Sequence, residues 1–322
     1  MTRRHDRSRT TRYAAALLSV AGLATWGAGL ATWGAGLPAW RDGLPGWPAV
    51  ASASPVRGAQ VRAVRTEPEV VVSAYAIAQL TSYIAGKYVR VVDLAPPGAQ
   101  PQALPATASA RAAIDHAALV IDVGYGYQPQ VETAVKSTRR HLSLLPKLSK
   151  QAQPYEFWLD PYLMAKASVL IANELTAVDP AGRRAFQDGS RNFQSVAVSI
   201  ESDFESTFSD CTRSEFVTAD GAFGRLAASF DLQDVAVDAT GVKKTAAIVQ
   251  QNSLPTVFSE MGVPAGSVQQ VARSTGAKVA SLNPLELAPE PGGPAPLSYF
   301  AVMEYDLTAL EGPLACDTTG NI

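Results

Sequence analysis

The stretch that decides the fold is DPAGRRAFQDGSRNFQSVAVSIESDFESTF, residues 179–208. Asp179 can cap a helix and Pro180 suits its first turn, and beyond Gly182 in that turn only Gly189 interrupts the segment with a strong helix breaker. Large apolar residues recur at steps of three or four residues, or their sum: Phe186, Phe193, Val196, Ile200, Phe204 and Phe208. The pattern predicts one helix of roughly 44 Å, at about 1.5 Å per residue, which is longer than a single domain needs.

Short apolar segments that alternate with helical patterns lie on both sides of this helix. The expected strands are 70–73, 89–94 and 118–123 before it, and 215–219, 235–237, 256–259 and 278–282 after it. Strands this apolar are typical of buried parallel sheets. We therefore expect an α/β fold with two parallel-sheet lobes joined by a single long helix. The alternative is a long helix packed along one larger domain.

The expected domain limits follow from this picture. They are an export signal at 1–53, a linker at 54–68, an N-terminal α/β lobe at 69–178, the connecting helix at 179–210 and a C-terminal α/β lobe at 211–322.

The N-terminal segment has the composition of an export signal. Five arginines stand within its first twelve residues, residues 13–37 carry no charge, and small residues follow. Cleavage is expected after Ala51 or Ala53. An uncleaved membrane anchor is the competing interpretation, because the uncharged run is long enough to span a bilayer. The leader contains no cysteine, so we expect no lipid tether, and we expect the protein outside the cytoplasm, secreted or associated with the cell surface.

Charge and cysteine content narrow the function further. Residues 1–53 hold six of the 27 basic and two of the 29 acidic residues, so the remainder has net charge −6, which argues against nucleic acid as a partner. The two cysteines, Cys211 and Cys316, are most simply a disulfide in an exported protein, with two buried free thiols as the alternative. The chain beyond the leader has no Gly-x-Ser-x-Gly, no Cys/His pairing and no His-x-x-x-His, so we expect no enzyme.

Five motifs, in this order, resemble the extracytoplasmic solute-binding proteins of zinc and manganese ABC importers over residues 69–316. They are PPGAQPQ (96–102), FWLDP (157–161), FVTADGAFG (216–224), TVFSE (256–260) and LNPLE (282–286). The resemblance implies two lobes joined by a rigid helix, one divalent metal ion between them, and a membrane permease as the partner of a monomer.

The metal ligands of that family are replaced in this chain. The positions that usually hold three histidines and a carboxylate carry Gln102, Glu156, Asp220 and Asn283, and Glu260 at another strand end is a candidate fifth ligand. The histidines beyond the leader are His116, at a junction between helix and strand, and His141, in a basic connector. Carboxylate and amide oxygens suit manganese or calcium better than zinc.

Three interpretations remain open at this point. The first is a metal receptor with altered ion preference, whose cargo is zinc or manganese by resemblance and a harder ion by ligand chemistry. The second is a degenerate family member that binds no metal and acts as a partner-binding module. The third is a pocket adapted to an organic solute.

Overall fold

The structure, a computed structural model, describes residues 67–288 and 298–316, with the exception of the Ala239 side chain. These residues belong to one compact unit, Ala63–Ile322. The predicted export signal and residues 54–66 of the predicted linker lie outside the described residues. No helix within the described ranges has the length and apolar character that crossing a membrane requires.

The first lobe is built on a parallel sheet with the strand order β2-β1-β3-β4. Its strands are β1 (Glu69–Val72), β2 (Arg90–Asp93), β3 (Leu119–Asp122) and β4 (His141–Ser143). Its helices are α2 (Tyr75–Ala85), α3 (Ala108–His116), α4 (Pro129–Ala134) and α5 (Leu145–Leu148). Val70–Val72 of β1 and Leu119–Ile121 of β3 are completely buried, which explains why these segments are apolar.

One strand of this sheet was not expected. His141, which the sequence placed in a connector, begins β4, and its Nε2 lies 3.2 Å from Oδ1 of the buried Asp122 on β3. The same nitrogen lies 3.2 Å from the Ser143 hydroxyl. β4 has three residues at the edge of the sheet, too few for an alternating pattern to show in the sequence.

The second lobe contains two parallel strand pairs. They are β5 (Glu215–Thr218) with β6 (Gln233–Ala236), and β7 (Thr256–Glu260) with β8 (Lys278–Leu282). β5 and β7 contact each other, and Phe216 packs edge-to-face on Phe258 with ring centroids 6.3 Å apart. The helices of this lobe are α8 (Gly224–Ser229), α9 (Val237–Thr240), α10 (Val242–Gln251), α11 (Gly266–Thr275) and α12 (Tyr299–Glu311).

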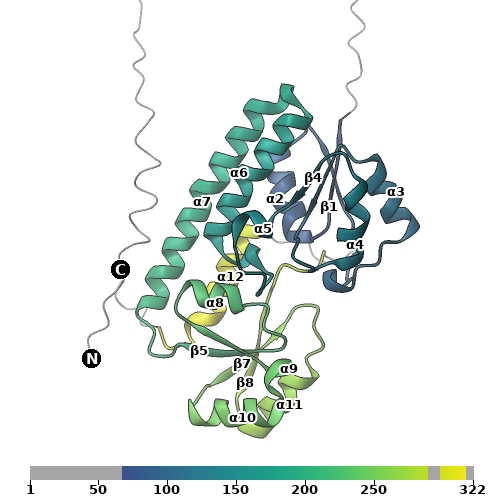
Figure 1. The fold of residues 1–322 in the computed structure, drawn as a ribbon. Coiled ribbons are helices and arrows are strands. Elements are labelled where there is room, and N and C mark those ends of the chain that lie inside the picture. Colours follow the sequence, from purple (N-terminus) through teal and green to yellow (C-terminus); the bar gives the residue numbers. More distant parts are fainter. Residues whose placement is uncertain (1–66, 289–297, 317–322) are drawn as a thin grey trace, which may run out of the picture. The chain divides into compact units, whose positions relative to one another are not determined.

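The long helix α7 (Arg183–Ser209) lies beside α6 (Pro161–Val178), as Figure 1 shows. It has 27 residues, and Asp179 caps a short 3-10 turn before it by accepting the Ala181 N–H. The long-helix prediction is therefore confirmed. Gly189 allows α2 to approach, because a Cβ there would lie 3.0 Å from the backbone of Ile84.

The predicted apolar stripe of α7 is wrong at one position. Val196 is 38% exposed, whereas the neighbouring Ala197 is buried. At about 100° per residue, Val196 lies roughly 80° from the mean direction of the buried phenylalanines. A residue at the edge of the apolar stripe satisfies the same three- or four-residue spacing as one at its centre. Only the packing in the folded protein shows which of the two is buried.

The last helix contacts both lobes and the connecting helix. Cys316, shortly after α12, forms a disulfide with Cys211, which follows α7, so the predicted pairing is present. At the other end of α12, Tyr299 and Phe300 stack against Phe193 of α7, with centroids 5.4 and 5.0 Å apart, and Phe300 also meets Tyr83 of α2. Helix α12 thus packs on α2 of the first lobe as well as on α7.

Candidate metal centre

The predicted ligand Gln102 lies on the loop that follows β2, in a single 3-10 turn, Pro101–Ala103. Its side-chain Nε2 donates a hydrogen bond to Oε1 of Glu286, 3.0 Å away. Glu286 follows β8 and is only 2% exposed. The amide oxygen of Gln102 is not used in this bond and can still face a cation.

Tyr127 approaches the same carboxylate from the turn after β3. Its hydroxyl donates to Oε1 of Glu286 at 3.3 Å, and the side chain is 2% exposed. Gly124 makes this turn possible: its φ is +89°, and a Cβ there would lie 2.8 Å from the Pro146 ring. Burial, together with the charges of Glu286 and Glu156, raises the pKa of Tyr127 well above its ordinary value.

Glu156 precedes the 3-10 turn Phe157–Leu159 and is 7% exposed. Burial raises its pKa to about 8, and the charges of Glu286 and Asp220 add to the rise, while Arg225 opposes it. The Arg225 side chain belongs to α8, and its Nε donates to the Pro154 carbonyl at 2.8 Å. Arg225 therefore ties the loop that carries Glu156 to the second lobe.

Asp220 is the common neighbour of these carboxylates. It follows β5, is exposed, and turns the chain at Gly221 by accepting the Ala222 N–H at 3.1 Å. Its charge contributes to the raised pKa of Glu156 and to that of Glu286, which burial and Asp220 bring to about 7. The bonds from Gln102 and Tyr127 oppose the rise at Glu286 because they stabilise the charged form.

Two more carboxyl groups, those of Glu260 and Asp234, are close enough to Asp220 for its charge to affect their pKa values. Glu260, the predicted fifth ligand, is 3% exposed, and burial together with the adjacent Asp220 raises its pKa to about 10. Asp234 of β6 accepts the Thr218 hydroxyl at 2.6 Å, and burial raises its pKa to about 7. With so many carboxyl groups close together, some must hold protons unless a cation balances them.

Asn283 is placed differently from the other predicted ligands. Its Oδ1 accepts the Leu285 N–H at 3.0 Å, and its backbone N–H donates to Asp306 at 2.8 Å. The side chain is thus engaged in its own turn. The interactions above bring together Gln102, Glu156, Asp220 and Glu260, and they add Glu286 and Tyr127, which the sequence did not single out. Glu286 could have been noticed, because it is the one carboxylate of the LNPLE motif.

The acidic side chains of the candidate centre are too far apart to hold a metal ion together in the arrangement described here. Within residues 67–288 and 298–316, no three histidine, cysteine, aspartate or glutamate side chains stand close enough together to hold a metal ion as they are. Carboxylates and amides of this kind suit hard cations.

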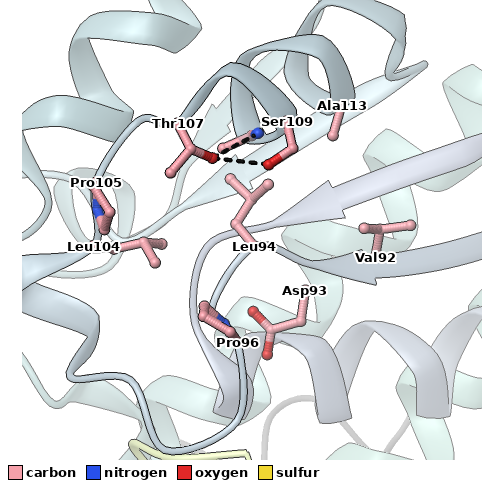
Figure 2. A pocket seen from close by; sticks show the side chains of 10 residues that line it. Val92, Asp93, Leu94, Pro96, Leu104, Pro105, Thr107, Ser109 and Ala113 are labelled. Carbon is pink, nitrogen blue, oxygen red and sulfur yellow. Dashed lines mark hydrogen bonds between the residues drawn. The ribbon is translucent and has the colours of Figure 1, made fainter.

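A cavity of about 460 Å³ lies apart from these residues, at the edge strand β2. Figure 2 shows its mostly apolar walls and the Thr107 hydroxyl, which bonds to Ser109 and to the Ala110 N–H at the start of α3. Asp93, also in its lining, has a pKa raised to about 6 by burial. None of the predicted ligands lines the cavity, so it is separate from the candidate centre.

Two parallel-sheet lobes on a long connecting helix, with polar side chains converging at the carboxyl ends of their strands, define a solute-binding protein of the helical-backbone class. Residues 70–312 match the family described as zinc-uptake complex component A, periplasmic, and the chain belongs to this family. The predicted fold class and the resemblance are thereby confirmed.

Individual relatives are distant. A putative metal-binding protein of Treponema pallidum is 22% identical over 274 residues, which cover 75% of this chain and 85% of the relative. The zinc-binding protein AdcA of Streptococcus pyogenes is 23% identical over 215 residues. These residues cover 63% of this chain but only 40% of that longer relative.

Solved structures share the fold. The laminin-binding protein Lmb of Streptococcus agalactiae aligns with a TM-score of 0.70 at 23% identity, covering 77% of this chain and all of that one. The periplasmic zinc-binding protein TroA of Treponema pallidum aligns with a TM-score of 0.69 at 18% identity, covering 77% of this chain and 99% of that one.

Proposed function

We propose that this protein is the solute-binding component of a metal-ion ABC importer, which captures a divalent cation between its lobes and delivers it to a membrane permease. Family membership supports the transport role. The observation that carries the proposal is the convergence of Glu156, Asp220 and Glu286, three carboxylates from distant segments. The charge of Asp220 contributes to the raised pKa of both Glu156 and Glu286, and the charge of Glu286 contributes to that of Glu156. The protein transports a solute and has no catalytic role.

The proposed ligands are Glu156, Asp220 and Glu286, together with the amide oxygen of Gln102. Glu260 is proposed as an additional carboxylate ligand. Asn283 remains a candidate from the sequence, and it would have to bind the ion while still accepting the Leu285 N–H. No imidazole or thiolate is among these side chains, so we expect manganese or calcium before zinc. Affinity should resemble that of loose oxygen-ligand calcium sites, about 10⁻⁵ to 10⁻³ M.

A solute-binding protein of an importer works outside the cytoplasm, and the leader accounts for this location. The leader directs a mature protein that begins near Ser52 or Ser54 to the outside of the cytoplasm, where it works as a monomer. N-terminal sequencing of the exported protein tests this, and recovery of residues 22–49 would show that the leader is retained as an anchor.

Calorimetric titration with manganese, calcium and zinc tests the metal function on the wild type, on Asp220→Ala and on Asp238→Ala. Asp238 is an exposed aspartate of α9 and serves as a control for the loss of one negative charge. We expect manganese or calcium binding that Asp220→Ala abolishes and Asp238→Ala preserves. Tight zinc binding that survives Asp220→Ala would show that the ligand set is wrong. No heat with any ion would favour the degenerate module instead.

A further inference from the structure

The two oxygens of the Glu286 carboxylate have different surroundings. Oε1 accepts two hydrogen bonds from the first lobe, one from Gln102 Nε2 at 3.0 Å and one from the Tyr127 hydroxyl at 3.3 Å. Neither of these two groups donates a hydrogen bond to Oε2. A carboxylate oxygen has two lone pairs in its plane, so two donors fill the acceptor capacity of Oε1. Only Oε2 then remains for a cation.

The Tyr127 donor is held firmly in place. Tyr127 is 2% exposed, and its ring packs on Tyr155 and Trp158 with centroids 5.1 and 5.8 Å away. The Trp158 indole N–H donates to the Pro284 carbonyl at 2.8 Å, two residues before Glu286. The phenol and the carboxylate are thus fixed to one buried frame. Little water can reach Oε1 to replace a lost donor, because Glu286 is also 2% exposed.

We propose that Tyr127, together with Gln102, is a positioning residue that restricts Glu286 to one-oxygen coordination through Oε2, and that the centre therefore selects manganese against calcium. This inference rests on the proposed metal-capture function and narrows its cargo.

The selection follows from coordination number. Calcium takes about six to eight oxygens at roughly 2.3–2.6 Å and commonly obtains them from carboxylates that bind through both oxygens. A carboxylate with one oxygen occupied can supply only the other, which suits an octahedral ion with six ligands. Manganese also loses hydration water more readily than magnesium, which keeps several waters and binds few protein ligands.

Tyr127→Phe isolates the effect, because it removes the hydroxyl and keeps the ring. One lone pair of Oε1 becomes available, and two-oxygen binding of calcium becomes possible. We expect the ratio of calcium to manganese dissociation constants to fall on the order of tenfold, the size of effect expected when one hydrogen bond to a charged group is lost. The electron paramagnetic resonance signal of free manganese, followed while calcium competes, measures this ratio on the full exported chain.

Two controls match this change. Tyr125→Phe removes a phenol from the same turn, whose hydroxyl donates to the Ser149 carbonyl at 3.1 Å. Gln100→Ala removes another bond between the lobes, from Nε2 to the Gly262 carbonyl at 2.8 Å. Neither bond involves Glu286, and both variants should keep the wild-type ratio within about twofold, a change of under half a kcal/mol.

The possible outcomes distinguish a failure of the positioning role of Tyr127 from a failure of the proposed metal capture. An unchanged ratio in Tyr127→Phe, beside a wild type that binds both ions, overturns the positioning role and leaves metal capture standing. A wild type that prefers calcium overturns the selectivity even if Tyr127→Phe fails to fold. A wild type that binds neither ion contradicts the proposed function itself.

Discussion

Gln102 Nε2 and Glu286 Oε1 lie 3.0 Å apart although 184 residues separate them in the chain. The bond joins the loop after β2 of the first lobe to the loop after β8 of the second, at the candidate metal centre. The amide of Gln102 therefore contacts a proposed metal ligand directly.

Glu286→Gln should weaken manganese binding much more than Asn283→Ala. Replacing the Glu286 carboxylate removes a charge that faces the ion, and we expect at least about a tenfold loss of affinity, as for a charge-assisted contact. Asn283→Ala removes the bond from Oδ1 to the Leu285 N–H and should cost about 1 kcal/mol of stability. Calorimetry and urea unfolding of both variants distinguish the two roles. A larger loss of affinity in Asn283→Ala would restore Asn283 as the ligand.

Metal affinity should increase with pH between about 6 and 8. The pKa of Glu156 is raised to about 8 and that of Glu286 to about 7, so both carboxyls hold protons below these values. A bound cation requires the charged forms and must displace those protons. Calorimetry in buffers with different ionisation enthalpies counts the protons released, and we expect release near pH 7 that shrinks above pH 8. Binding that is independent of pH would exclude both side chains as ligands.

The ion-free protein should become more stable as the pH falls from about 8 to 5. Burial raises the pKa of Asp234 in the folded protein to about 7, above that of the unfolded chain. The folded state therefore binds the proton more tightly, and its stability rises as the pH falls through the interval between the two values. Asp234→Asn should remove on the order of 2 kcal/mol of this dependence, since one pKa unit corresponds to about 1.4 kcal/mol.

Urea unfolding at several pH values, in the presence of a chelator, measures this effect. Asp238→Asn provides the exposed control and should leave the pH dependence unchanged. Equal slopes for the wild type and Asp234→Asn would show that Asp234 is charged in the folded protein.

The Cys211 to Cys316 disulfide should stabilise the fold without affecting the metal centre. It joins residues 105 positions apart, so the chain-entropy estimate for the double Cys→Ser variant is a loss of up to about 4–5 kcal/mol, and less in practice. The Thr212 and Arg213 N–H groups still donate to Ala315 and Leu314, which should keep the two segments together. Unfolding and calorimetry measure the two properties. Two alkylatable cysteines in the native protein would contradict the bond.

The sequence predicted the architecture well because each element carried its own local signal. The α7 segment showed its cap at Asp179 and its repeat of phenylalanines, and the apolar runs of β1 and β3 indicated strands buried on both faces. Local signals failed where context decides the outcome. Val196 satisfied the spacing of the stripe and still lies at its exposed edge, and β4 is too short to show a pattern.

What the sequence determined by itself was most of the elements, the family and the oxygen-rich character of the candidate centre, because these depend on residue type and order along the chain. The tertiary structure decided which side chains meet. It brought Glu286 and Tyr127 to Gln102, and it occupied the Asn283 amide in a local turn. The physical reason is that the contacts of Glu286 join loops from different lobes, and their geometry depends on how the two lobes pack together, which spacing along the chain does not encode.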